Sequence, residues 1–142
     1  MMTELRNQNG YGALELVLAA AFILFPFAVL LLSFPVQMEY RSMADAAARQ
    51  AARACAVAYG PTEGQNHAEA IAQIVLSERG LDSSSAVVAV DCLSSWAPGS
   101  VVTATVSVEA PAFSIMEVWT VGSLTMTSTY REQIEPYRSL PK

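Results

Sequence analysis

The feature that most constrains this chain is one run of uncharged, mostly apolar residues from Leu16 to Val36. A helix needs roughly 20 such residues to cross the hydrocarbon core of a bilayer, so this run is long enough for one transmembrane helix. Glu15 stands at the N-terminal edge of the run. A carboxylate is costly to place in lipid, and its presence at this edge therefore suggests a partner or a function.

Two simpler interpretations of the apolar run stay open. A secretory signal peptide has a shorter apolar region, of about 7 to 15 residues, followed by a small-x-small cleavage site. This run is longer and passes into SFPVQMEYRS without such a site. The other alternative is an uncleaved membrane anchor. Pro26 and Pro35 lie inside the run or at its end, and each predicts a kink in the helix.

Length and charge narrow the class of protein. A chain of 142 residues is enough for one small domain besides a membrane segment. The net charge is -5 and Lys and Arg form no cluster, which argues against binding to nucleic acid or to anionic lipid through a basic patch. Positive charge does not decide the orientation, because Arg6 precedes the run and Arg41 follows it, each beside an acidic residue.

Helical periodicity continues beyond the apolar run. We therefore predict one long helix from Gly12 to Tyr59, ended by Gly60 and Pro61. Its second half carries a stripe of small residues, which we interpret as the surface that packs on the protein's own sheet, with a subunit interface as the alternative. The stripe comprises Met43, Ala46, Ala47, Gln50, Ala51, Ala54, Cys55 and Ala58. A second face repeats charged residues every four positions, namely Arg41, Asp45, Arg49 and Arg53.

The remaining residues predict a small α+β domain. Apolar spacing indicates a second, short helix over Asn66 to Arg79. Alternating β-branched residues predict three strands, Ala86 to Leu93, Val101 to Glu109 and Leu124 to Arg131. Pro98-Gly99 is typical of a turn, so the first two strands should form an antiparallel hairpin. Pro111 and residues 113–119 are expected to form a longer connection to the third strand, and the tail from Glu132 to Lys142 is expected to be loosely ordered.

The fold class expected from these elements is therefore α+β, with a long helix packed on a short helix and a three-stranded antiparallel sheet. Cys55 falls near the end of the long helix and Cys92 near the end of the first strand. A disulfide between them would clamp sheet to helix and stabilise the domain by about 3–4 kcal/mol in the chain-entropy model. Two buried, unpaired thiols are the alternative.

No pattern of residues predicts catalysis or a cofactor. The chain lacks a nucleophile elbow, an HExxH motif and a phosphate-binding glycine loop, and two cysteines without a companion histidine do not predict a metal site. His67 is expected to be a solvated or capping residue, and Trp96 and Trp119 are expected to pack in the core or at its edge. An extracytoplasmic ligand-binding or adhesive domain on a tether leaves no motif and stays an alternative.

The order of these segments resembles the TadE-like pseudopilins of the Tad (Flp, type IVc) pilus system. Four pieces carry the resemblance over nearly the whole chain: GYGALELVLAA, ADAAARQAARACA, PGSVVTATVSVEAP and LTMTSTYRE. It implies a leader over residues 1–10, the transmembrane half of a long helix over residues 11–36 and an extracytoplasmic domain over residues 37–142. A prepilin peptidase would cleave after Gly10 and leave Tyr11 as the new N-terminus.

The resemblance further implies an assembly role and not an enzymatic one. The Glu15 carboxylate of one subunit would meet the terminal ammonium of Tyr11 in a neighbour, since each charge alone is costly in lipid. An interfacial acid facing lipid headgroups is the plainer interpretation of Glu15. Such a minor pilin would initiate or cap a pilus from the inner membrane, with its N-terminus in the cytoplasm. Its partners would be other Tad/Flp pilins, the prepilin peptidase and the assembly platform, and an uncleaved single-pass scaffold is the competing role.

Overall fold

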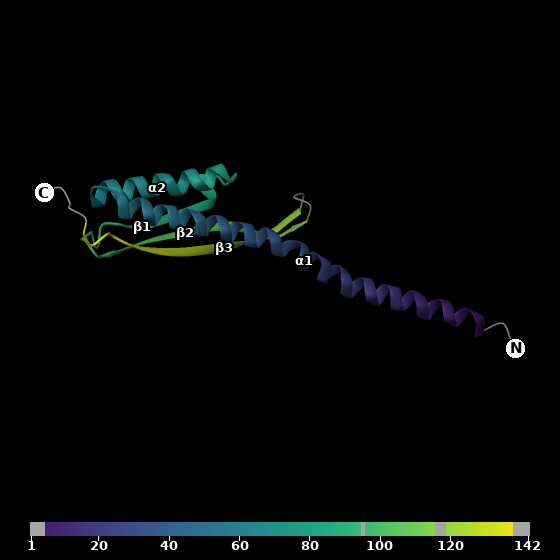
Figure 1. The fold of residues 1–142 in the computed structure, drawn as a ribbon. Coiled ribbons are helices and arrows are strands. Elements are labelled where there is room, and N and C mark those ends of the chain that lie inside the picture. Colours follow the sequence, from purple (N-terminus) through teal and green to yellow (C-terminus); the bar gives the residue numbers. More distant parts are fainter. Residues whose placement is uncertain (1–4, 95, 116–118, 138–142) are drawn as a thin grey trace.

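The computed structural model describes the backbone of residues 5–94, 96–115 and 119–137, and the side chains of residues 12–94, 96–112 and 121–137. A long helix, α1 (Leu5–Val57), is followed by α2 (Pro61–Glu78) and a short 3₁₀ turn (Ser83–Ser85). Three strands then form one antiparallel sheet in the order β1-β2-β3: β1 (Ala86–Asp91), β2 (Val101–Ile115) and β3 (Trp119–Gln133). The predicted α+β class is confirmed. Only the C-terminal part of α1 packs in the domain, and its N-terminal part projects as a bare rod (Figure 1).

Helix α1 is longer at its start than the sequence predicts and two residues shorter at its end. It continues through both internal prolines, Pro26 and Pro35. The chain then turns at Gly60, which is extended, into α2. Pro61 occupies the first turn of α2, where its missing N–H costs nothing because that group has no partner within a helix. This position of Pro61 explains why α2 begins five residues before the predicted Asn66.

The C-terminus of α2 has the geometry that its glycine predicts. Gly80 has a φ of 81°, which is the left-handed region that a residue with a Cβ rarely adopts. The Gly80 N–H donates to the Ser77 carbonyl at 3.0 Å, and the Leu81 N–H donates to the Leu76 carbonyl at 3.1 Å. These two bonds form a Schellman motif, which satisfies the last carbonyls of the helix.

Strands β2 and β3 are each 15 residues long, so the predicted connection over residues 113–119 is wrong. Their pairing runs from Val101↔Gln133 to Ile115↔Trp119. Pro111 does not interrupt β2, because β1 pairs with β2 only as far as Val108. Beyond that point no described strand pairs with this edge of β2, and a strand tolerates proline at such an edge. We call the two-stranded part beyond β1, residues 109–115 and 119–125, the β-arm.

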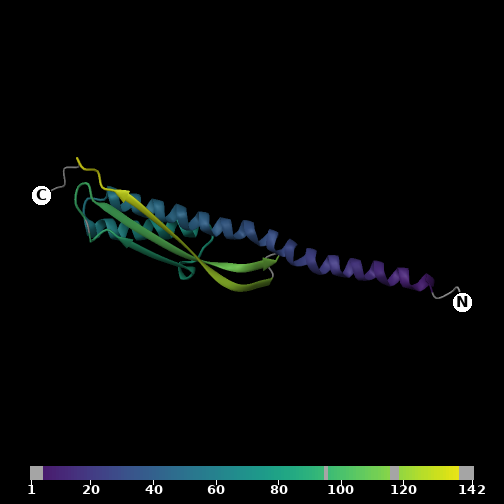
Figure 2. The same cartoon turned by 90° about the horizontal axis from the view of Figure 1, so that it is seen from below.

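The core lies between the sheet and a layer formed by α1 and α2 (Figures 1 and 2). One face of β2 is buried, as its alternation predicts, and the alanine-rich face of α1 packs against it. The predicted stripe on α1 is partly displaced: Gln50 is exposed and Ala46 and Ala54 are half-buried. The reason is that α1 contacts both α2 and the sheet, which buries a wider arc. The fully buried small and β-branched residues include Ala44, Ala47, Ala48, Ala51, Ala52, Ala68, Ala72, Val102, Ala104 and Val106.

The C-terminal segment is more ordered than expected. Strand β3 extends to Gln133, and the next residue, Ile134, is fully buried in the core. Its backbone N–H donates to the Ser100 carbonyl at 2.8 Å, and its carbonyl accepts from the Gly99 N–H at 3.0 Å. The expectation of a loosely ordered tail from Glu132 is therefore wrong for its first residues. The tail contains an apolar residue, Ile134, that anchors it in the core.

Candidate functional site

The first unusual surface is the projecting half of α1. Within the part of the chain that the structure describes, α1 is the one helix long and apolar enough to cross a membrane. Its large side chains are mostly more than half exposed, which in water would be very unfavourable. Those exposed residues are Leu14, Leu16, Val17, Leu18, Phe22, Ile23, Leu24, Phe25, Phe27, Leu30, Leu31, Leu32 and Phe34. A single-pass membrane segment is the simplest environment for this surface.

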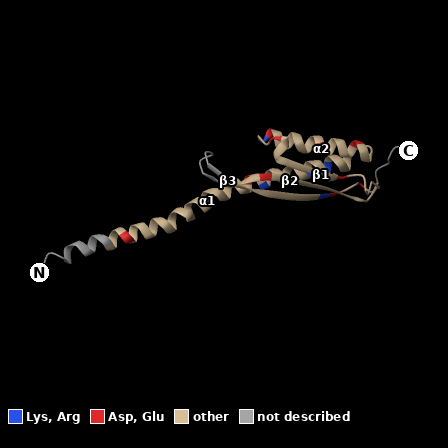
Figure 3. Cartoon of the chain, turned by 180° about the vertical axis from the view of Figure 1, so that it is seen from behind, with Lys and Arg blue, Asp and Glu red and all other residues tan. Residues whose placement is uncertain are grey.

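Glu15 is the one charged residue on this projecting surface between Gly12 and Met38. It is exposed, and no other charged residue occurs from Gly12 to Met38. In Figure 3 the coloured part of the projecting helix carries one acidic band, which a long uncharged stretch of α1 separates from the charges of the domain. Gly10 and Tyr11 lie in the same helix, with Tyr11 one helical turn before Glu15. The backbone thus places the three residues of the predicted processing and pairing site close together on α1.

The predicted disulfide is present. Cys55, in the last turn of α1, is bonded to Cys92, directly after β1, with the two Cα atoms 6.1 Å apart. Both residues are fully buried. The Cys92 N–H also donates to the Gln65 side-chain carbonyl of α2 at 3.3 Å. The end of β1 is therefore tied to both helices at one place.

A polar cluster joins α1 to β3 on the other side of the domain. The Asp45 carboxylate accepts from the Arg49 guanidinium at 2.5 Å and from the Ser128 hydroxyl at 3.1 Å. The Arg49 guanidinium lies 5.6 Å from the ring centre of Tyr130. The four-residue spacing predicted the Asp45–Arg49 pair but not its contacts with the sheet. Because both charged side chains are substantially exposed, the cluster contributes alignment more than stability.

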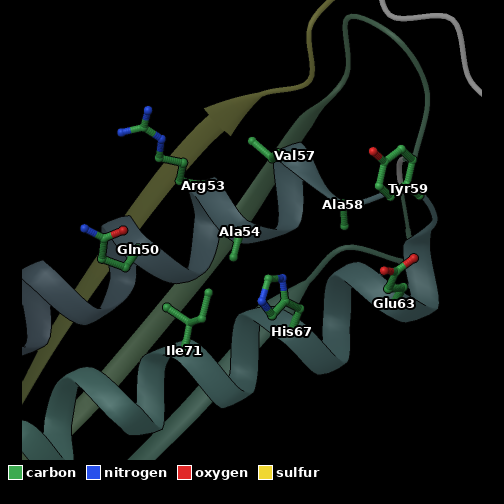
Figure 4. A pocket seen from close by; sticks show the side chains of 9 residues that line it. All are labelled: Gln50, Arg53, Ala54, Val57, Ala58, Tyr59, Glu63, His67 and Ile71. Atoms are coloured by element: carbon green, nitrogen blue, oxygen red, sulfur yellow. The ribbon is translucent and has the colours of Figure 1, made fainter.

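A hollow of about 370 Å³ lies where the end of α1 meets the start of α2 (Figure 4). Its lining is mainly apolar, and Ala54, Ile71 and His67 face one another across the two helices (Figure 4). His67 is exposed, as the sequence predicts. Arg53 points away from the hollow in the same view. The ionisable side chains in its lining are Arg53, Tyr59, Glu63 and His67.

Trp96 is half-buried against the core, as expected, whereas the side chain of Trp119 lies outside the described residues. Among the described residues, no three His, Cys, Asp or Glu side chains approach closely enough to hold a metal ion. The candidate site is therefore the N-terminal part of α1 around Glu15, held away from the domain.

Comparison with known proteins finds no relative of this chain. No family model, no curated protein and no solved structure matches the chain.

Proposed function

We propose that this chain is a minor pilin or pseudopilin of a Tad/Flp type IVc pilus, cleaved by prepilin peptidase after Gly10. The observation that carries the proposal is the single exposed carboxylate, Glu15, on an otherwise uncharged and exposed stretch of α1. A helix of this kind needs lipid or other apolar helices around it. A carboxylate among them needs a counter-charge.

Cleavage after Gly10 creates that counter-charge. The new α-amino group of Tyr11 is a cation near the membrane edge, and it would pair with Glu15 of a neighbouring subunit. The attraction between the two charges offsets the cost of removing both from water only at short range, so the pair favours one axial register between subunits. Assembly of α1 helices side by side then follows from the pairing.

The domain argues for initiation or capping instead of the repeating shaft. It is an α+β unit of about a hundred residues, far larger than the head of a major Flp pilin, and it would remain outside the cytoplasmic membrane while the N-terminus lies inside the cytoplasm. Its disulfide suits an oxidising, extracytoplasmic compartment. The proposed partners are major and minor Tad/Flp pilins, the prepilin peptidase and the assembly platform, with no catalysis and no cofactor.

The test is the N-terminal sequence and intact mass of the protein isolated from its native membrane. The proposal expects a chain that begins at Tyr11. In a Gly10→Ala variant the peptidase should no longer cleave, so residues 1–10 should be retained. Gly12→Ala is the matched control, because it changes a nearby glycine of α1 where an added Cβ would meet nothing within 4 Å, and it should be cleaved normally.

A second role, an uncleaved single-pass scaffold of a secretion or pilus machine, is favoured by one observation. Helix α1 continues through Gly10 back to Leu5, so residues 5–10 of the predicted leader and the membrane segment form one helix. The same mass measurement separates the two roles. A native chain that begins at Met1 or Met2 would require the scaffold role and withdrawal of the Glu15 charge pair.

A further inference from the structure

Three contacts, the last of them in the β-arm, fix how β2 and β3 lie along α1. Tyr130 of β3 stacks on Arg49, Ser128 bonds to Asp45, and the Ala112 carbonyl of β2 accepts from the Gln37 side-chain amide at 3.1 Å. Each contact is closer to the N-terminus of α1 than the one before, at Arg49, Asp45 and Gln37 in turn. The β-arm therefore runs toward the N-terminus of α1, and Figures 1 and 2 show the two side by side in both views.

Extrapolating these contacts places the end of the β-arm beside the apolar run. Ser128, which bonds to Asp45, is paired with Val106 of β2. From Val106 to Ala112, which bonds to Gln37, β2 advances six residues. Over the same distance α1 advances eight residues, from Asp45 to Gln37. At this ratio Ile115 lies level with about Ser33, a few residues inside the run that ends at Val36.

Burial on α1 agrees with this placement. Ser33 is only 4% exposed, although its neighbours Leu32 and Phe34 are more than half exposed. Between Val29 and Tyr40 the less exposed positions follow one helical stripe, as expected for a face covered by a neighbouring element. The stripe comprises Val29, Ser33, Val36, Gln37 and Tyr40. Gln37 of this stripe donates to the Ala112 carbonyl of the β-arm, and Figure 2 shows the arm beside α1.

The sequence of the β-arm has the composition of a membrane contact. Over residues 109–115 and 119–125 it carries one ionisable residue, Glu109 at its start, and two aromatic residues, Phe113 and Trp119, while Glu117 stands in the sequence between its two strands. Among the described side chains, Val121 is 62% exposed. Aromatic and apolar residues gather at the boundary between headgroups and acyl chains.

We propose that the end of the β-arm is a second membrane contact, which enters the headgroup–acyl boundary of the leaflet on the side of the domain, next to α1. The proposal rests on the membrane-spanning placement of α1 in the proposed function. From Val36 to Val29 a helix rises about 10 Å, which is the depth to which the covered stripe extends. The contact would fix the rotation and the height of the domain above the bilayer.

Backbone chemistry limits this contact to a shallow depth. Strands β2 and β3 pair with each other as far as Ile115↔Trp119. Among the described strands, however, none pairs with the outer edge of either along the β-arm. Unpaired N–H and C=O groups are too costly for the hydrocarbon centre but are tolerated where water and headgroups reach them. The boundary region is therefore the depth that suits both the side chains and the backbone.

The test is the membrane depth of a nitroxide label on the full chain, reconstituted singly in phosphatidylethanolamine/phosphatidylglycerol nanodiscs. Three variants, Val121→Cys, Thr127→Cys and Ile23→Cys, are labelled without reductant, so that the Cys55–Cys92 disulfide stays intact. Thr127 is the matched control, since it is exposed on the same strand but near the level of Asp45. Ile23 marks the centre of the apolar run.

Depth is measured as the ratio of collision rates with oxygen, which enters lipid, and with a nickel chelate, which stays in water. We expect the ratio at Val121 to be severalfold above that at Thr127 and below that at Ile23. A Val121 ratio equal to that of Thr127, with Ile23 in lipid, would overturn the β-arm contact and leave the span intact. An aqueous ratio at Ile23 would instead remove the span, and the arm contact with it. Shielding of Val121 only when two copies share a disc would identify a second chain as its partner and overturn the lipid contact.

Discussion

At the scale of single residues, Gly64 sets how closely α1 and α2 approach. A Cβ at this buried position would lie 3.2 Å from the Ala58 Cβ and 3.3 Å from the Cys55 carbonyl oxygen. Neither atom belongs to a flexible side chain, so a larger residue must push the helices apart.

Gly64→Leu should therefore lower the free energy of unfolding by about 1–3 kcal/mol, as overpacking does in other cores. Denaturant unfolding followed by tryptophan fluorescence would measure the loss, because Trp96 lies 3.5 Å from the same Cβ position. Asn66→Leu, which is exposed on the same helix, is the control and should change stability by less than about 0.5 kcal/mol. Equal effects of the two substitutions would show that the helix contact is not tight.

Asp91 offers a pH-dependent readout of the turn after β1. The Ser94 hydroxyl donates to its carboxylate at 2.5 Å and the Ser94 N–H donates at 3.1 Å, and these bonds hold the pKa of Asp91 below its ordinary value of 3.8. A lowered folded-state pKa stabilises the fold above the unfolded-state pKa. This contribution disappears as the pH falls through the folded-state value.

In Ser94→Ala the side-chain bond is lost, so the pKa of Asp91 should rise toward the ordinary value. An NMR titration of the Asp91 carboxyl carbon measures this directly. An unchanged Asp91 titration would mean that the hydroxyl does not bond to the carboxylate in solution.

At the scale of elements, the disulfide connects the last turn of α1 to the end of β1. The bonded cysteines are 37 residues apart, and the loop between them contains all of α2. Breaking the bond frees this loop in the unfolded chain. In a Cys55→Ala/Cys92→Ala double variant, the free energy of unfolding should fall by about 3–4 kcal/mol.

Chemical unfolding of the double variant and of the reduced wild-type protein measures this effect, and the two should agree once the deleted sulfur atoms are allowed for. A non-reducing gel of the wild-type protein should show a reduction-sensitive mobility shift. Labelling of both thiols in native, unreduced protein would contradict the bond itself.

At the scale of the whole molecule, the central expectation concerns assembly. Replacing Glu15 by Gln keeps the shape of the side chain but removes its charge, so a neighbour's terminal ammonium would lose its partner. A cation left unpaired in lipid costs several kcal/mol, and incorporation into pili should therefore fall on the order of tenfold or more. Membrane insertion should be unchanged, because the apolar run is intact.

The measurement compares the amount of this protein in sheared pili and in the membrane fraction. Glu39→Gln is the control, since Glu39 is the next acid along α1 and lies beyond the apolar run. Normal incorporation of the Glu15→Gln protein would leave Glu15 as an interfacial acid facing headgroups.

The sequence alone determined the elements that depend on local pattern. The uncharged run, the period of small residues in α1 and the alternation in β2 each follow from short-range spacing, and they predicted the long helix, the α+β class and the Val102, Ala104, Val106 and Val108 face. The sequence also predicted the Cys55–Cys92 bond, because it placed Cys55 near the end of the long helix and Cys92 near the end of the first strand. The predicted role of Gly10, Tyr11 and Glu15 stays a prediction.

Only the tertiary structure decided what depends on neighbours distant in sequence. Whether Pro111 ends a strand depends on whether β1 still lies alongside, and the sequence does not state where β1 stops. The burial of Ile134 likewise depends on partners far away along the chain. The β-arm that lies beside α1 is therefore a product of packing, because a strand's length is set by the partner it pairs with and a helix face is buried only by what crosses it.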